Sequence, residues 1–276
     1  MKSTERTWPR EILQRRHFIR TLIPIALLLG LLLSFDCVAH FVQILLDTSR
    51  GDRVDTREIE VLIRFAHPFE QTLMDMAPPE FLSVQAPDGI HDLSASLREE
   101  RENGRRYYRS RYAYSRPGDH IFLVKPKAYF EAAEAKFIQH FTKLVVNAGG
   151  VESGWDQAFG LPVEIIPLTR PYGLWRGNLF SGRVLVGGKP AANTRVEVAY
   201  ENRRKIEAPS PLHAVQVLKT DANGLFSYAM PFSGWWGYAA LTESEARIKR
   251  EDGNSYAVEI GGLIWVYADA PLPQGE

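Results

Sequence analysis

Short apolar runs with a two-residue period, separated by turn sequences, constrain the fold of this chain more than any other feature. In residues 60–65 the side chains of Val61, Ile63 and Phe65 fall on one face of an extended chain. Comparable runs recur at residues 107–114, 121–124, 137–146, 161–168, 182–186, 194–200, 215–220, 225–229, 236–241 and 256–267. Short strands at this spacing, rich in valine and aromatic residues, predict an all-β fold of the sandwich class.

Turn sequences stand between several of these runs. Residues 116–119 read Arg-Pro-Gly-Asp, with proline and glycine where turns favour them. Residues 187–190 (Gly-Gly-Lys-Pro) and 221–224 (Asp-Ala-Asn-Gly) are hairpin signals. They predict pairing of residues 182–186 with 194–200 and of residues 215–220 with 225–229.

The order of the runs predicts two β-sandwich-like units after an N-terminal segment. We expect residues 1–39 to form a signal peptide or a membrane anchor and residues 40–158 to form a first β domain. Residues 159–276 should form a C-terminal β-sandwich domain of immunoglobulin-like or prealbumin-like type. The two units together hold about 235 residues, enough to bury ordinary hydrophobic cores.

The N-terminal segment has the charge and apolar pattern of an export signal. Basic residues precede an apolar run at residues 21–35, which is nearer in length to a signal peptide than to the ~20 residues of a spanning helix. Residues 37–39 (Cys-Val-Ala) loosely fit a signal-peptidase site. Residues 14–20 also resemble a twin-arginine export signal, so ordinary secretion and the twin-arginine route are both open.

Cleavage after Ala39 would begin the mature chain at His40. The alternative is an uncleaved anchor, which would bury Asp36 and His40 in lipid at a cost of a few kcal/mol per charge. In both cases the rest of the chain should lie outside the cytoplasm, in the periplasm or an equivalent compartment. The reason is that the positive charge precedes the apolar run.

Charge, cysteine content and motifs narrow the function. Lysine plus arginine and aspartate plus glutamate number 33 each, a balance that argues against a nucleic-acid partner. The one cysteine, Cys37, lies in the leader, so a metal site elsewhere must use histidine, carboxylate, methionine or backbone ligands. No nucleophile motif stands out, and we expect a binding protein rather than an enzyme.

An N-terminal His40 would carry a free α-amine and an imidazole, two nitrogens that can bind one metal ion together. Their usual pKa values, about 7.7–8.0 and about 6.5, mean that a metal displaces few protons at neutral pH. Such nitrogens suit Ni, Cu and Zn, and a planar set favours Cu(II) or Ni(II). The alternative is that His40 is simply an exposed terminal residue.

Three further residues are candidate ligands. His67 follows an alternating strand and precedes Pro68, which holds it extended, while Glu70 lies three residues on. His140 falls on the inward face of its predicted strand and therefore needs a partner. Both histidines could instead be ordinary loop or core residues. The other histidines after the leader lie beside turn residues and are predicted to be at the surface: His91, His120 and His213.

Several short motifs together resemble one known family. They are Ala39-His40-Phe41, His67-Pro68-Phe69-Glu70, Pro117-Gly118-Asp119, Lys125-Pro126-Lys127, and the segments 136–143, 160–165, 220–224 and 234–237. In combination they are similar to the DUF4198 family, the periplasmic component that accompanies energy-coupling-factor nickel and cobalt transporters. The resemblance implies a β-rich, extracytoplasmic protein that assists uptake of a divalent metal. It also implies a mature N-terminus at His40 and a site containing His67, with Glu70 and His140 as candidates.

We therefore expect residues 40–158 to bind nickel, with cobalt or copper possible, and to pass it to a membrane-embedded energy-coupling-factor transporter. Copper should bind such a nitrogen site more tightly than nickel, so selectivity would come from supply and from the partner. Two alternatives stay open. One is a copper redox enzyme with an N-terminal histidine brace. The other is a structural or carbohydrate-binding sandwich, for which Trp235 and Trp236 are the best support, although we expect both side chains to pack in the core.

Overall fold

The computed structural model describes residues 39–46 and 57–271. The chain divides into two compact units, and all of these residues belong to the second, Val38–Glu276. The predicted export signal, apart from Ala39, lies outside the described residues. Among the residues described, no helix combines the length and the apolar character needed to cross a membrane.

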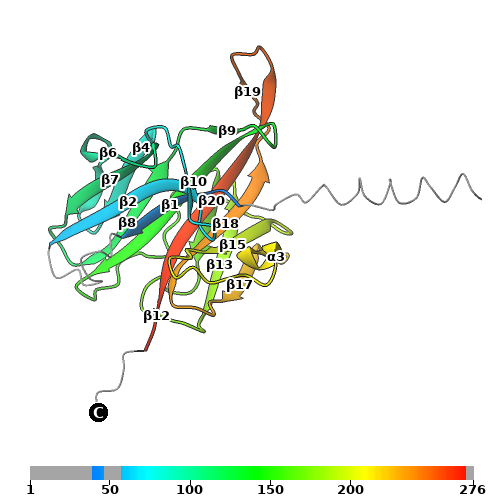
Figure 1. The fold of residues 1–276 in the computed structure, drawn as a ribbon. Helices are drawn as coiled ribbons and strands as arrows, with labels where there is room; N and C mark the ends of the chain where they lie inside the picture. The colour runs from blue at the N-terminus through cyan, green and yellow to red at the C-terminus, as the bar shows by residue number, and fades with distance from the viewer. Residues whose placement is uncertain (1–38, 47–56, 272–276) are drawn as a thin grey trace, which may run out of the picture. The chain divides into compact units, whose positions relative to one another are not determined.

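The described chain consists almost entirely of strands, which confirms the all-β prediction (Figure 1). In this part of the chain the helical segments are α3 (Pro211–Ala214) and the short 3-10 turn η4 (Ser94–Ser96). The strands form three sheets, here called the first, central and third sheets.

The first sheet has the strand order β1-β2-β7-β6, with β3 also paired to β2. Its strands are β1 (Phe41–Leu46), β2 (Glu58–His67), β3 (Thr72–Met74), β6 (Arg98–Glu102) and β7 (Arg105–Ala113). Five of the six residues of β1 are buried, so side chains on both faces of this strand are covered.

The central sheet has the order β16-β15-β18-β20-β10-β8-β4-β5, with β9 paired to β10 and with β12 and β19 paired to β20. Its strands are β4 (Phe81–Ala86), β5 (Gly89–Asp92), β8 (Gly118–Lys125), β9 (Tyr129–Glu131), β10 (Lys136–Ala148), β12 (Leu174–Trp175), β15 (Arg195–Tyr200), β16 (Val215–Lys219), β18 (Gly234–Glu243), β19 (Ile248–Lys249) and β20 (Ser255–Asp269). β10 and β20 run parallel, from Lys136 beside Ala257 to Leu144 beside Trp265.

The third sheet has the order β11-β13-β14, with β17 paired to β13. Its strands are β11 (Val163–Pro167), β13 (Leu179–Val186), β14 (Lys189–Pro190) and β17 (Leu225–Ala229).

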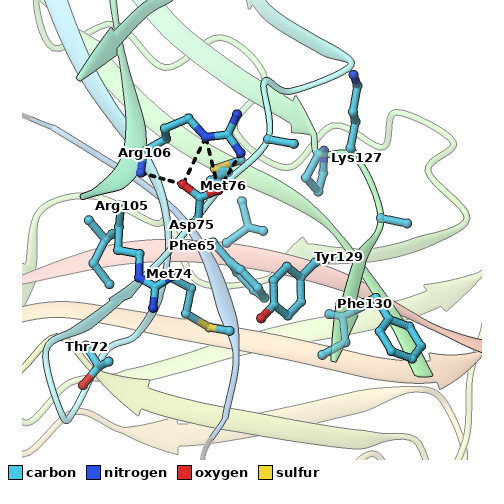
Figure 2. A pocket seen from close by; sticks show the side chains of 16 residues that line it. Phe65, Thr72, Met74, Asp75, Met76, Arg105, Arg106, Lys127, Tyr129 and Phe130 are labelled. Carbon is cyan, nitrogen blue, oxygen red and sulfur yellow. Dashed lines mark hydrogen bonds and ion pairs between the residues drawn. The ribbon is translucent and has the colours of Figure 1, made fainter. Parts of the chain in front are cut away.

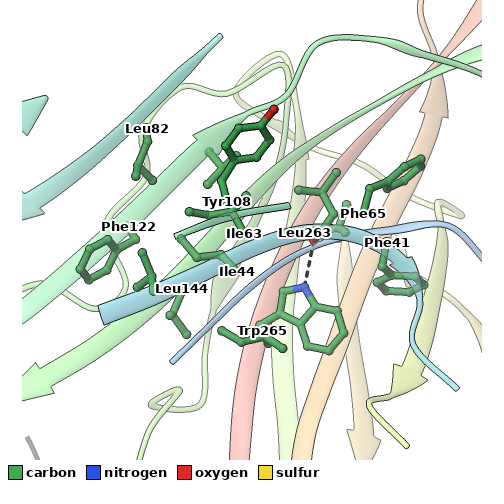
Figure 3. Packing of buried hydrophobic residues seen from close by; sticks show 14 of the residues in the cluster. Phe41, Ile44, Ile63, Phe65, Leu82, Tyr108, Phe122, Leu144, Leu263 and Trp265 are labelled. Carbon is green, nitrogen blue, oxygen red and sulfur yellow. Dashed lines mark hydrogen bonds between the residues drawn. The ribbon is translucent and has the colours of Figure 1, made fainter. Parts of the chain in front are cut away.

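The central sheet is buried on both faces. Along β20, Leu263 and Trp265 belong to the core shared with the first sheet, whereas Ile264 and Val266 belong to the core shared with the third sheet. The two-residue period of one strand therefore serves two cores. Trp265 lies among the residues of the former core and donates its Nε1–H to the carbonyl of Val42 at 3.1 Å, tying β20 to β1 (Figure 3).

The predicted boundary after residue 158 falls between β10 and β11. The first sheet comes wholly from the chain before this point and the third sheet wholly from the chain after it, but the central sheet takes strands from both sides. The two sandwiches thus share their middle layer. The division into two domains stays a prediction.

Both predicted hairpin pairings are wrong, although the turns themselves are present. Residues 187–188 close a tight hairpin between β13 and β14, while β15 pairs with β16 and β18 in the central sheet. The 221–224 turn likewise leads from β16 in the central sheet to β17 in the third sheet. Gly224 has a φ of +76°, and a Cβ there would lie 2.7 Å from the carbonyl oxygen of Val184. A turn sequence fixes where the chain reverses, whereas burial decides which layer the next strand joins.

Candidate metal centre

Strand register brings His40 and His67 together at one end of the first sheet. The antiparallel ladder between β1 and β2 pairs Phe41 with Ala66, so one residue further His40 falls opposite His67. Their ring centroids are 4.6 Å apart and the rings meet edge to face. Two residues 27 positions apart in the sequence thus form one histidine pair.

Glu131, at the end of β9, forms a hydrogen bond with His40 of this pair. The Nε2 of His40 lies 2.9 Å from the Glu131 carboxylate. When the Nε2–H of His40 donates to this side chain, the other ring nitrogen, Nδ1, carries the lone pair that can bind a metal. Burial lowers the pKa of His40, and His140 adds to this effect, while Glu131 and Glu134 oppose it. The imidazole is therefore neutral at physiological pH, as metal binding requires.

His67 contributes a buried ring nitrogen to the same end of the sheet. Its Nε2 is buried and has no hydrogen-bond partner among the described residues. Burial lowers its pKa to about 4, with a further contribution from the charge of His40 against the opposing charge of Glu131. A buried polar atom without a partner is rare in native proteins and calls for an explanation such as a bound ion.

His140 reaches the same region from the central sheet. It is 1 % exposed, as predicted for an inward-facing residue, and its Nε2 lies 3.4 Å from Glu259 on β20. Gly261 stands beside it on β20 and makes room for the ring, because a Cβ there would lie 2.5 Å from the His140 Cδ2. The Nδ1 of His140 has no partner among the described residues.

Acids and a lysine surround this histidine. Lys136 binds both Glu134, at 2.5 Å, and Glu259, at 2.6 Å. Burial raises the pKa of Glu259, but the bond and charge of His140 and then of Lys136 outweigh it and lower this pKa to about 2. An ionised Glu259 fixes the orientation of the His140 ring, as carboxylates do for metal-binding histidines.

The predicted acid, Glu70, lies outside this group. It is exposed in the turn after β2, where Gln71 adopts a left-handed φ of +56° and donates to the carbonyl of Pro68. The carboxylate that bonds His40 is instead Glu131, a residue that was not among the predicted ligands. The sequence offered no signal for this, because the contact depends on β9 pairing back onto β10.

One further histidine corrects an expectation, and the two tryptophans bear on the carbohydrate-binding alternative. His120, predicted at the surface, is fully buried, and its ring packs against Tyr112 and Tyr114. Trp235 and Trp236 are buried, one in each core, and this weighs against a carbohydrate-binding surface built on them.

The described side chains alone do not form a finished metal site. No group of three or more His, Cys, Asp or Glu side chains in residues 39–46 and 57–271 is placed to hold an ion. In the uncleaved chain the backbone nitrogen of His40 belongs to the peptide bond with Ala39 and is not a ligand. Cleavage at this bond would free the α-amine of His40. The amine would then be a third nitrogen beside the imidazoles of His40 and His67.

Comparison with known proteins gives one family match. A family model described as a domain of unknown function, DUF4198, matches residues 37–244. No curated protein matches the chain.

Among solved structures, the D0-D1 domain of intimin is 12% identical over 81% of this chain and 99% of that chain, with a TM-score of 0.20. The native conformation of Escherichia coli alpha-2-macroglobulin is 10% identical over 75% of this chain and 13% of that chain, with a TM-score of 0.18. Likenesses this weak say nothing about function.

Proposed function

The chain belongs to the DUF4198 family, and we propose that it binds a divalent metal ion, nickel above all, outside the cytoplasm and passes it to a membrane transporter. The observation that carries this proposal is the buried Nε2 of His67, which has no partner among the described residues and lies at the edge-to-face contact with His40. The transporter, of the energy-coupling-factor type, is the recipient that the sequence resemblance implies.

The donors that would hold the ion are nitrogens. After cleavage, the α-amine and the Nδ1 of His40 can close a chelate ring, since Glu131 already holds the opposite ring nitrogen. The Nε2 of His67 supplies a third nitrogen, and His140 stands near enough for its charge to influence His40. Nitrogen donors without thiolates suit Ni(II) and Cu(II), with Co(II) next.

The placement of the site suits a carrier that must release its cargo. The side chains of His40 and Glu131 are 11% and 14% exposed, so the pair lies at the edge of the core rather than deep within it. Three nitrogens also leave coordination positions open on an ion that prefers more ligands. An incoming ligand from a transporter could occupy these positions before the ion leaves.

Calorimetry with Ni(II), on the protein as the cell processes it, tests the proposal. Mass spectrometry should first show His40 as the N-terminal residue, since an intact leader would remove the chelate. His67→Ala should weaken Ni(II) binding by more than the roughly 10–100-fold that loss of an outer-shell partner costs. The matched control is His213→Ala, because His213 is exposed in α3. Unchanged Ni(II) binding in His67→Ala would place the site elsewhere.

Copper distinguishes the carrier from an oxidase with a histidine brace. The same edge-to-face pair, His40 and His67, would suit Cu(II), which binds such nitrogens more tightly than nickel. A carrier loaded with Cu(II) should produce no more peroxide from ascorbate than free copper does. Peroxide well above that level would favour the enzyme.

A further inference from the structure

A cavity of about 420 Å³ adjoins the histidine group along the strands. Four extended segments each contribute one residue to the wall of this cavity. Each of these residues lies two positions along its segment from one of the four side chains His40, His67, Glu131 and His140. Val42, Phe65, Ile138 and Tyr129 line the cavity, next to His40, His67, His140 and Glu131 respectively. Residues two apart in a strand share a face and lie roughly 7 Å apart. The cavity therefore begins one pleat away from the proposed ligands.

The nearest wall of the cavity is aromatic. The rings of Phe65 and Tyr129 lie 5.0 Å apart, and Phe65 also stacks on His40 at 5.9 Å (Figure 2). Phe130 lines the same cavity. A flat or apolar ligand that enters here would contact aromatic rings on one side and approach the proposed metal on the other.

The rest of the lining carries excess positive charge. Arg105, Arg106 and Lys127 line the cavity, against the single carboxylate of Asp75. Asp75 is occupied by Arg106, which it binds through both oxygens. Arg105 and Lys127 are exposed at the rim of the cavity, have no carboxylate partner in the described chain, and lie well apart from each other in Figure 2. Two cations without carboxylate partners beside an apolar wall favour an organic anion.

We propose that this cavity binds the carboxylate end of a small aromatic or apolar chelator whose other end holds the metal. This inference rests on the proposed function. The protein side chains leave coordination positions open on the ion, and a chelator would fill them. The cargo would then be a metal chelate rather than a bare ion, and its free carboxylate would bind one of the two cations, Arg105 or Lys127.

Two related chelators distinguish binding in the cavity from binding at the metal site. Pyridine-2,4-dicarboxylate and pyridine-2-carboxylate both chelate Ni(II) through the ring nitrogen and the 2-carboxylate, but only the former has a second carboxylate directed away from the metal. Calorimetry on the processed full chain should show the dicarboxylate complex binding at least about 10-fold more tightly, a difference of about 1.4 kcal/mol. Arg105→Ala with Lys127→Ala should abolish this preference and leave binding of Ni(II) alone unchanged.

Arg183→Ala with Lys189→Ala is the matched control, because both residues are exposed cations of the third sheet. This variant should keep the preference for the dicarboxylate complex. Equal binding of the two complexes by the wild type would overturn the proposed carboxylate pocket. Binding of Ni(II) in the absence of a chelator would in that case still support the metal site. A preference that depends on Arg105 and Lys127, without binding of Ni(II) alone, would uphold the pocket and overturn the histidine chelate. The same loss in the control variant would also overturn the pocket, since it would show a general charge effect.

Discussion

At the residue scale, the imidazole of His67 gives the metal-free protein a pH-dependent stability. Burial lowers its pKa from 6.5 to about 4. Between these values the unfolded chain binds a proton that the folded chain does not, so the free energy of unfolding falls as the pH drops through this window. The pKa difference sets a limit of about 3 kcal/mol, and solvent around the half-buried ring reduces the loss to about 1–2 kcal/mol.

Urea unfolding at about pH 7 and about pH 4.5, in the absence of metal, measures this loss. In His67→Gln the free energy of unfolding should fall less between the two pH values than it does in the wild type, by about 1–2 kcal/mol. An equal fall in the wild type and the variant would show that the His67 pKa is not lowered in the folded protein.

The candidate site was predictable in part at this scale. His40, His67 and His140 stand out by position and by the motifs around them, and the structure brings the first two into contact. Their register was not predictable, because β1 escaped our strand predictions and only its ladder with β2 sets the two residues opposite each other. Glu131 was missed for a related reason. Its role depends on a short strand that has no apolar period of its own.

At the scale of elements, a buried polar network anchors the strands that carry the histidines. Glu201, just after β15, has a fully buried side chain and binds Arg64 of β2. It also accepts a hydrogen bond from Gln43 of β1 at 2.5 Å. Arg64 donates to Gln43 as well, which closes the network. The end of the central sheet is thus linked to both strands that bring His40 and His67 together.

Glu201→Ala should lower the free energy of unfolding by about 3–5 kcal/mol, because it leaves Arg64 half-buried without its countercharge. Glu207→Ala, at an exposed carboxylate a few residues on, should stay within about 0.5 kcal/mol of the wild type. Chemical denaturation of both variants checks the pair. A loss at Glu201 no larger than at Glu207 would show that the network contributes nothing to stability.

Strands were easier to predict than their partners. The long, apolar β10 and β20 were expected almost to their ends, because their residues are buried on both faces. The hairpin pairings failed because β15 and β17 each leave the layer of the strand before them. Local sequence holds the turn chemistry, such as the glycine at position 224, but the choice of layer depends on residues far along the chain.

At the scale of the whole described unit, the shared central sheet couples the two halves. The core under the first sheet contains Leu263 and Trp265, which come from the last strand, and β10 pairs along nine residues with β20. A fragment of residues 40–158 would lose this part of its core and expose one edge of β10. The same cut would leave β20 without β10, the longer of its two parallel neighbours in the described chain.

We therefore predict that fragments 40–158 and 159–276 do not fold alone but associate when produced together. Circular dichroism during heating should show no cooperative transition for either fragment and one for the mixture, as for the chain 40–276. A cooperative transition in an isolated fragment would instead support two independent domains with a boundary at residue 158.

The parallel pairing of β10 with β20 also sets the time at which the chain can fold. The ladder joins Lys136 to Ala257, and β20 follows every other described strand in the order of synthesis. Contacts between such distant segments form slowly, since a long loop must close first. The middle layer therefore stays incomplete until β20 has left the ribosome, and the core that Leu263 and Trp265 complete can form only after that point.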